Sequence, residues 1–146
     1  MKCIFDANVY LYAINSEAGR QMFARRFFPL VFRTTLCSVV AEELYAGALD
    51  EGAVGLVERY TGALQRAKRV VAPTFDDWEE AGKLIARLTI KEPSRKSKAQ
   101  QPLNDVLIAL CARRIGATLF TFNRDDFQLI RRYRPFSLEV LTFSDG

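Results

Sequence analysis

The stretch CIFDAN, residues 3–8, decides how this chain folds and where its chemistry lies. Three apolar residues in a row at the start of the chain are typical of a strand buried in a parallel sheet. The strand ends at Asp6. An acid at the carboxyl end of such a strand faces the crevice where α/β folds place their sites. Asp6 is therefore the first candidate site residue, although it could instead cap the turn that follows.

The rest of the chain alternates helical and strand-like patterns. Helical spacing of apolar residues predicts helices over residues 17–28, 38–47, 51–68, 74–90, 102–115 and 126–132. Short apolar runs predict strands over residues 30–35, 69–73, 118–122 and 138–143. We expect Pro29 to end the first helix, Ser38 to cap the second, and the polar residues 91–101 to form an exposed loop. The alternation predicts an α/β fold with a mostly parallel central sheet flanked by helices.

Composition sets the broad class of protein. The 146 residues, 49% apolar and 26% charged, suffice for one domain with its own core. Charges interrupt every apolar run before the ~20 residues that a membrane span needs, so we expect no transmembrane segment. The first strand follows Met1 directly, without an apolar signal region, which favours the cytoplasm. Cys3, Cys37 and Cys111 lie in apolar surroundings, and we expect them to be reduced core residues.

The absence of histidine excludes several mechanisms at once. Ser-His-Asp and Cys-His hydrolases, histidine-paired ribonucleases and histidine zinc sites all require it. Proton transfer must therefore use carboxylates, lysine, tyrosine or metal-bound water. The net charge of +4 and the pI near 9.1 fit a polyanionic partner, and they equally fit a basic surface without a special role.

Two further acids lie on helices that are otherwise apolar. Asp105 precedes the apolar residues 106–112, so it either belongs to a site or stabilises the helix N-terminus through the helix dipole. Glu43 precedes Leu44 on the side of its helix that the helical phase predicts to be buried. Glu42 could be the inward-facing acid instead, although the phase favours Glu43.

Carboxylates gathered in a cleft need a cation, because like charges a few ångströms apart repel and raise each other's pKa. Oxygen ligands of this kind suit Mg²⁺ or Mn²⁺. Such an ion lowers the pKa of a bound water and neutralises charge on a phosphodiester. We therefore expect Asp6, Glu43 and Asp105 to converge on one divalent cation in a protein that hydrolyses nucleic acid.

Four segments together resemble a known family. Residues 4–9 (IFDANV), 43–47 (ELYAG), 105–109 (DVLIA) and 121–127 (TFNRDDF) have the order and spacing found in PIN-domain ribonucleases. Within that family the chain looks most like the VapC toxins of bacterial and archaeal toxin–antitoxin modules. The resemblance implies a single PIN domain over residues 1–146, with the three-layer PilT N-terminus fold.

The resemblance also implies an activity and partners. A VapC-like protein is expected to be a Mg²⁺- or Mn²⁺-dependent endoribonuclease that acts on RNA, forms a homodimer and is inhibited by a small cognate antitoxin. Its catalytic, metal-binding acids fall on Asp6, Glu43 and Asp105. The fourth family position, often aspartate, is Asn123 here, which removes a negative charge and leaves open whether one or two metal ions bind.

Other side chains are expected to support these acids. Asp126 is a further candidate metal ligand by resemblance, and the alternative is that it caps the short helix that follows. Asn8, Thr121 and Asn123 are expected to orient carboxylates or water from a second layer. Basic residues in the loop before Asp105 could follow RNA phosphates or simply be solvated. These loop residues are Lys91, Arg95, Lys96 and Lys98. The same choice, or contact with a partner, applies to Arg20, Arg25 and Arg26.

Three other functions stay open on the residues alone. A PIN nuclease in RNA processing would need no antitoxin. A catalytically inactive PIN domain would only bind RNA, and Asn123 is the residue that favours this alternative. Phosphoryl transfer through an aspartyl intermediate at Asp6 would need a second acid two residues later, where the chain has Asn8. Metal-dependent cleavage of RNA separates the nucleases from the other two.

Overall fold

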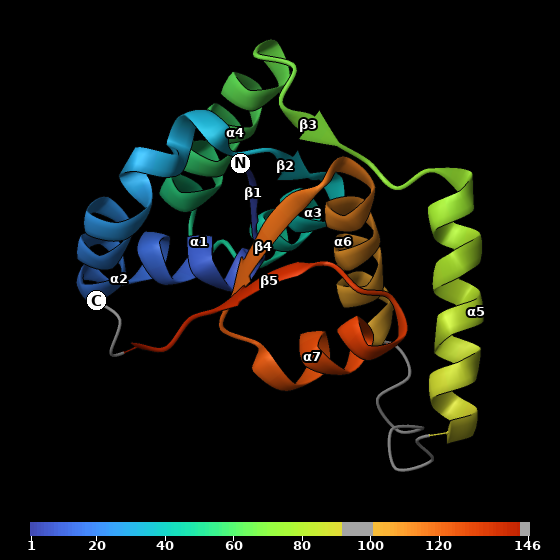
Figure 1. The fold of residues 1–146 in the computed structure, drawn as a ribbon. Helices are drawn as coiled ribbons and strands as arrows, with labels where there is room; N and C mark the ends of the chain where they lie inside the picture. The colour runs from blue at the N-terminus through green and yellow to red at the C-terminus, as the bar shows by residue number, and fades with distance from the viewer. Residues whose placement is uncertain (92–100, 144–146) are drawn as a thin grey trace.

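The structure is a computed structural model and describes residues 1–91 and 101–143. Its strands form two groups, and the strands within each group run parallel to one another. The first group has the spatial order β1-β4-β5 and the second pairs β2 with β3 (Figure 1). The strands are β1 (Lys2–Phe5), β2 (Leu36–Cys37), β3 (Val70–Val71), β4 (Ala117–Thr121) and β5 (Ser137–Val140).

A short contact joins the two groups into one sheet. Cys3 in β1 forms a parallel bridge with Thr34, and the Thr35 N–H donates to the Cys3 carbonyl oxygen at 2.8 Å. The strands therefore follow one another as β3-β2-β1-β4-β5, which confirms the predicted parallel sheet. The chain leaves β1 toward β2 on one side and returns to β4 on the other. Such a switch point between neighbouring strands is where open α/β sheets place their sites.

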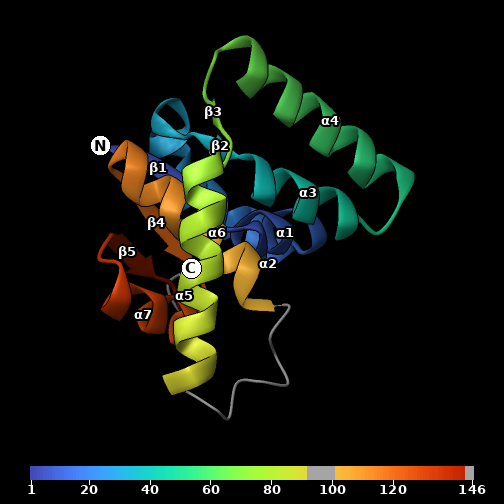
Figure 2. The same ribbon diagram turned by 90° about the vertical axis from the view of Figure 1, so that its right-hand side faces the viewer.

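Helices surround this sheet. Helix α6 lies between β4 and α5, so α5 stands on the outside of the molecule (Figures 1 and 2). None of the helices that the structure describes is long and apolar enough to cross a bilayer. The α-helices are α1 (Ala7–Asn15), α2 (Glu17–Met22), α3 (Ser38–Ala46), α4 (Glu51–Arg66), α5 (Phe75–Lys91), α6 (Gln101–Ile115) and α7 (Arg124–Tyr133).

The segment between α2 and β2 differs from the prediction. The chain continues from α2 as a π-helical turn, Phe23–Phe27, and then as a 3₁₀ helix, Phe28–Arg33. The prediction of a strand over residues 30–35 is therefore wrong. Pro29 does not end the helical segment, because it lies in the first turn of the 3₁₀ helix, where a missing N–H costs no hydrogen bond.

Element ends agree with the prediction to within a few residues. A capping box opens α5: the Thr74 N–H donates to Asp77 Oδ2 at 2.9 Å and the Asp77 N–H donates to Thr74 Oγ1 at 3.1 Å. Ser38 is the first residue of α3 rather than its cap. The last strand ends at Val140, which pairs with the final residue of β4, so no partner strand is left to extend it.

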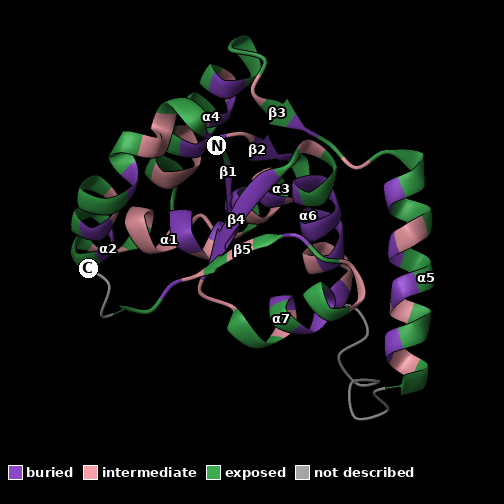
Figure 3. Cartoon of the chain, viewed as in Figure 1, coloured by how far each residue is buried: buried purple, intermediate pink, exposed green. Residues whose placement is uncertain are grey.

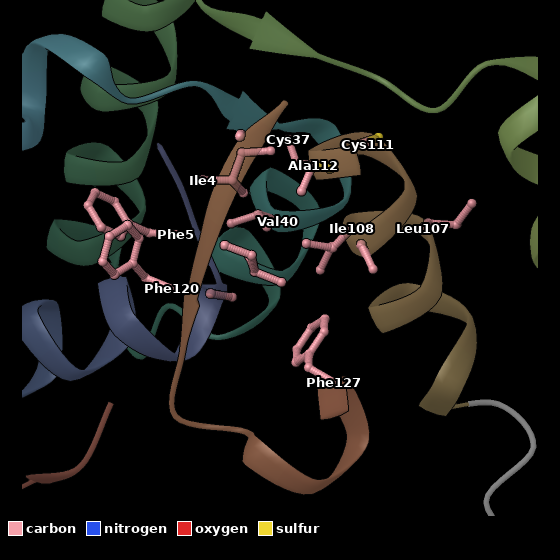
Figure 4. Close-up of a cluster of buried hydrophobic side chains, with 14 of the residues drawn as sticks. Ile4, Phe5, Cys37, Val40, Leu107, Ile108, Cys111, Ala112, Phe120 and Phe127 are labelled. Atoms are coloured by element: carbon pink, nitrogen blue, oxygen red, sulfur yellow. The ribbon is translucent and has the colours of Figure 1, made fainter. Parts of the chain in front are cut away.

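The core lies on both sides of β1 and β4. Every residue of β4 is buried (Figure 3), as are residues 106–112 of α6. Figure 4 shows Phe127 and Ile108 among the side chains that pack here. All three cysteines are buried and free, which confirms the prediction of reduced core residues. The Phe5 ring lies 5.0–5.8 Å, centroid to centroid, from four other aromatic rings. These are Tyr10, Phe23, Phe27 and Phe120.

Candidate active site

Asp6 stands at the switch point of the sheet. It follows β1, and its N–H donates to the carbonyl oxygen of Phe120 in the neighbouring β4 at 2.9 Å. Its Oδ1 accepts the N–H of Ala7 at 2.8 Å and so caps α1. The two interpretations of Asp6 are therefore compatible, because Oδ1 caps the helix while Oδ2 faces the polar groups of the site.

The Thr121 hydroxyl organises the polar groups around Asp6. Its Oγ1 donates to Asp6 Oδ2 at 2.7 Å, accepts the Asn123 N–H at 2.9 Å and accepts from Asn8 Nδ2 at 3.3 Å. A hydroxyl has one donor and two acceptor sites, so every one of them is used. Thr121 is fully buried. Hydrogen bonds thus bring Asp6, Asn8, Thr121 and Asn123 together.

The charge of Asp6 is set by opposing effects. Burial raises the pKa of this carboxyl, because the charged form loses solvation, and only 5% of the residue is exposed. Hydrogen bonds from Thr121, the Ala7 N–H and Asn8 lower the pKa again. The carboxylate is thereby held in one orientation with its charge partly compensated.

Glu43 is the second acid of the site. It is half-buried on α3, whereas Glu42 is exposed, so the structure turns Glu43 inward. Its Oε2 accepts from Asn104 Nδ2 at 3.5 Å, and its buried Oε1 has no hydrogen-bond partner in the described structure. Burial first, and then the negative charge of Asp6, raise the pKa of Glu43 to about 7, which Asn104 offsets in part.

Asp105 and Asp126 meet at one amide. Asn123 Nδ2 donates to Asp105 Oδ2 at 3.2 Å and to Asp126 Oδ2 at 3.1 Å. Because α6 begins at Gln101, Asp105 lies beyond the first turn, and the helix-dipole explanation loses its basis. Asp126 lies within the first turn of α7 rather than at its cap position, which is Asn123.

The acids are linked, but they do not form one closed cluster. Among the residues that the structure describes, no group of three His, Cys, Asp or Glu side chains is close enough to hold one ion. The direct convergence of Asp6, Glu43 and Asp105 on one cation is therefore not seen in this conformation. The groups form a chain instead, from Glu43 to Asp6 by charge and from Asp6 to Asp105 through Thr121 and Asn123.

The donor set nevertheless fits a hard divalent cation. All the groups are oxygen donors, and Glu43 Oε1 is a buried acceptor without a partner, which is costly unless a ligand satisfies it. Mg²⁺ in proteins often binds through one or two carboxylates and keeps several waters. Asp6 and Glu43 would suffice for such binding.

Asn104 was not among the predicted site residues. This side chain binds Glu43 from the residue next to Asp105, and the only local signal was a second polar residue ahead of an apolar helix. Of the basic loop, Lys91 is exposed at the end of α5, while Arg95, Lys96 and Lys98 lie outside the described residues. On α2, Arg20 pairs with Glu17 at 2.9 Å.

Fold and side chains together define a small α/β protein with an acidic, oxygen-rich site at the switch point of a parallel sheet. The PIN domain family matches residues 3–133. The chain belongs to the PIN domain family. Among curated proteins, none matches it at a significant level.

Solved structures share the fold over nearly the whole chain. VapBC-1 from nontypeable Haemophilus influenzae is 23% identical with a TM-score of 0.62, covering 96% of this chain and 98% of that one. VapBC2 from Rickettsia felis, solved with a DNA fragment from its promoter, is 22% identical with a TM-score of 0.60, covering 97% and 100%. FitAcB from Neisseria gonorrhoeae is 16% identical with a TM-score of 0.62, covering 93% and 95%. At these identities the likeness concerns the fold.

Proposed function

We propose that this chain is a Mg²⁺- or Mn²⁺-dependent endoribonuclease and the toxin of a VapBC-type toxin–antitoxin pair that acts in the cytoplasm. The observation that carries the proposal is the pairing of Asp6 with Glu43 at the switch point. The charge of one carboxylate raises the pKa of the other, and Glu43 Oε1 is buried without a partner. Membership of the PIN family supports the same chemistry, because PIN domains are typically nucleases.

Asp6 and Glu43 would hold the ion, with Asp105 and Asp126, which share the Asn123 amide, as further candidate ligands. When bound, Mg²⁺ would supply an activated water and neutralise charge on the phosphodiester. The amide of Asn123 adds no negative charge between Asp105 and Asp126 and donates to both. This arrangement supports one ion rather than two.

The protein's own groups prepare the acids for that role. Thr121 and the Ala7 N–H fix both oxygens of Asp6, so the carboxylate needs no reorientation. Glu43, with its pKa of about 7, exchanges a proton near neutral pH. A cation must displace that proton from Glu43, so we expect divalent-metal affinity to increase as pH rises through 7.

The activity is tested by incubating purified protein with a mixed RNA pool, with Mg²⁺ or with EDTA, and sequencing the new ends. We expect cleavage with Mg²⁺ only. Glu43→Gln should lower the rate at least 100-fold, while the exposed neighbour change Glu42→Gln should leave it within twofold. Cleavage that persists in EDTA, or equal losses in both variants, would overturn the assignment of the site.

The toxin part of the proposal rests on the likeness to VapBC and FitAcB structures and on an apolar groove. This groove of about 170 Å³ lies between α1, α3 and α4, and its lining includes Leu44, the residue that follows Glu43. We propose that an antitoxin segment anchors its apolar side chains there and places a cationic group near Asp6 and Glu43. The lining residues are Tyr10, Ala13, Ile14, Phe23, Leu44, Leu56, Val57 and Tyr60.

Growth measurements test this part separately. Expression of the chain should arrest growth, and co-expression of a small neighbouring gene should restore it. An antitoxin whose inserted Arg or Lys is changed to Ala should still bind but inhibit less. If the chain cleaves RNA but no neighbouring product binds it and growth is unaffected, a PIN nuclease of RNA processing is the better assignment.

We further propose a homodimer. The exposed aromatic residues Phe75 and Trp78 on the outer helix α5 support an interface there, since 79% and 51% of them are exposed. Light scattering of the purified chain should give twice the mass of 16.6 kDa. Trp78→Glu should shift that mass toward the monomer if α5 forms the contact.

A further inference from the structure

A basic cavity lies at the opposite end of the sheet from the acidic site. It has a volume of about 420 Å³ and is formed where β1 and β2 begin, where α4 turns into β3 and where α6 ends. Of the ten described residues that line it, five are Lys or Arg and none is acidic. In Figure 1 these segments meet at the upper edge, near the N-terminus. The five cationic residues are Lys2, Arg33, Lys68, Arg69 and Arg114.

Two of these cations make contacts that hold parts of the fold together. The Arg69 guanidinium donates to the Val31 carbonyl oxygen at 2.9 Å and holds the 3₁₀ helix against the turn before β3. Arg114 pairs with Asp77 at 3.0 Å and donates to the Ala72 carbonyl oxygen. These contacts fix the walls of the cavity.

The other three cations are not used by the fold. Within the described part of the chain, Lys2, Arg33 and Lys68 have neither a carboxylate partner nor a side-chain hydrogen bond. All three are exposed. Three uncompensated positive charges around one cavity repel each other, and an anion relieves that repulsion.

The backbone at Lys68 is a second, independent observation. Its φ of +58° makes it the only non-glycine residue with positive φ among those described, at the position just past the α4 cap where glycine is usual. A side chain makes this conformation unfavourable, whereas glycine adopts it freely. Helix termination therefore does not explain why the chain has lysine there.

An aromatic side chain completes the lining. Phe32, on the 3₁₀ helix, is 83% exposed and borders the cavity next to Arg33. An exposed ring beside cations is the combination that single-stranded nucleic acids contact, with bases on the ring and phosphates on the cations.

We infer that this cavity binds the phosphodiester backbone of single-stranded RNA, with Lys2, Arg33 and Lys68 on the phosphates and Phe32 against a base. The identity of the ligand rests on the proposed ribonuclease function. β1 separates the cavity from Asp6 by four residues, about 13 Å at ~3.3 Å per residue. The cavity would thus hold a part of the RNA remote from the cleaved bond.

A different interpretation assigns the cations to the carboxyl ends of α4 and α6, where positive charge stabilises a helix. The two interpretations differ in what Lys68→Gly does. If Lys68 stabilises a helix end, its loss lowers the melting temperature. If Lys68 binds phosphate, the melting temperature stays equal or rises, because glycine suits φ +58°, while RNA affinity falls.

Fluorescence anisotropy with a labelled twelve-nucleotide RNA in EDTA tests the inference without any need for catalysis. Each phosphate contact changes log Kd by about 0.7 for every tenfold change in salt concentration. One contact therefore strengthens binding about fivefold at 0.1 M salt relative to 1 M salt. We expect Lys68→Gly and Arg33→Gln each to weaken binding about fivefold, and the double variant about 25-fold. Phe32→Ala should weaken it by at least about fivefold.

Lys83→Gln is the control, because it removes one positive charge from an exposed position on α5 that does not line the cavity. It should change the affinity less than twofold. Equal losses in the control and the cavity variants, or no loss in the cavity variants, would overturn the inference. If AMP competes for the cavity as strongly as the oligonucleotide does, the ligand is a free nucleotide and not an RNA strand.

Cleavage kinetics separate this inference from the proposed function. The cavity variants should raise KM for a long RNA and leave kcat unchanged. If the wild-type chain cleaves no RNA, the proposed function fails, while the anisotropy result still decides whether the cavity binds RNA.

Discussion

Replacing Glu43 by Gln should stabilise the metal-free protein at pH 8 and have little effect at pH 4.5. Burial and the charge of Asp6 raise the pKa of Glu43 from 4.5 to about 7 in the folded state. The stability that follows from this raised pKa is fully present at pH values below the pKa of Glu43 in the unfolded state. It is lost as pH rises through the pKa of Glu43 in the folded state. The glutamine side chain carries no charge at either pH, so the variant does not lose this stability as pH rises. Its amide oxygen can still accept the hydrogen bond from Asn104.

The magnitude follows from the two pKa values. Their difference corresponds to at most about 3–4 kcal/mol, at about 1.4 kcal/mol for each pH unit. Glu43 keeps some contact with solvent, which screens its charge, so we expect about 1–2 kcal/mol at pH 8. For a chain of this length that corresponds to a rise in Tm of roughly 3–8 °C.

Urea unfolding followed by circular dichroism, at both pH values in EDTA, measures the effect directly. The control is Glu42→Gln, which removes the same charge from an exposed position and should shift stability by less than about 0.5 kcal/mol. A Glu43→Gln protein that is less stable than the wild type at pH 8, or is equally stabilised at both pH values, would refute the argument that a buried, repelled carboxylate lies at this position.

Three further changes test other parts of the site. Thr121→Val should cost about 1–3 kcal/mol of unfolding free energy, because buried polar groups lose their shared partner, and Thr121→Ser should restore most of it in the same urea assay. Asn123→Asp places a third carboxylate between Asp105 and Asp126, so Tm in EDTA should fall and Mn²⁺ should restore it, as scanning calorimetry can show. Asn104→Ala should raise the pKa of Glu43 further, seen as a shift of the pH–rate profile to higher pH.

Local patterns in the sequence were enough to predict the parallel sheet, and they singled out Asp6 and Glu43. Apolar runs such as residues 3–5 predict buried parallel strands, and the residue that follows such a run falls at the sheet edge, as Asp6 does. Helical phase separated Glu43 from Glu42 for the same reason, because it depends only on neighbours along the chain. The prediction failed over residues 30–35, where an apolar run forms a 3₁₀ helix and periodicity cannot separate short elements.

Only the tertiary structure decided how the acids are held and charged. The Thr121 hydroxyl binds Asp6 across 115 positions, and Asn104 reaches Glu43 across 61, because these contacts arise from strand pairing and helix packing rather than from local sequence. The raised pKa of Glu43 depends on burial and on the distance to Asp6, and neither can be read along the chain. The basic cavity likewise joins residues 2, 33, 68 and 114, which meet only because β1, β2, β3 and α6 share one edge of the molecule.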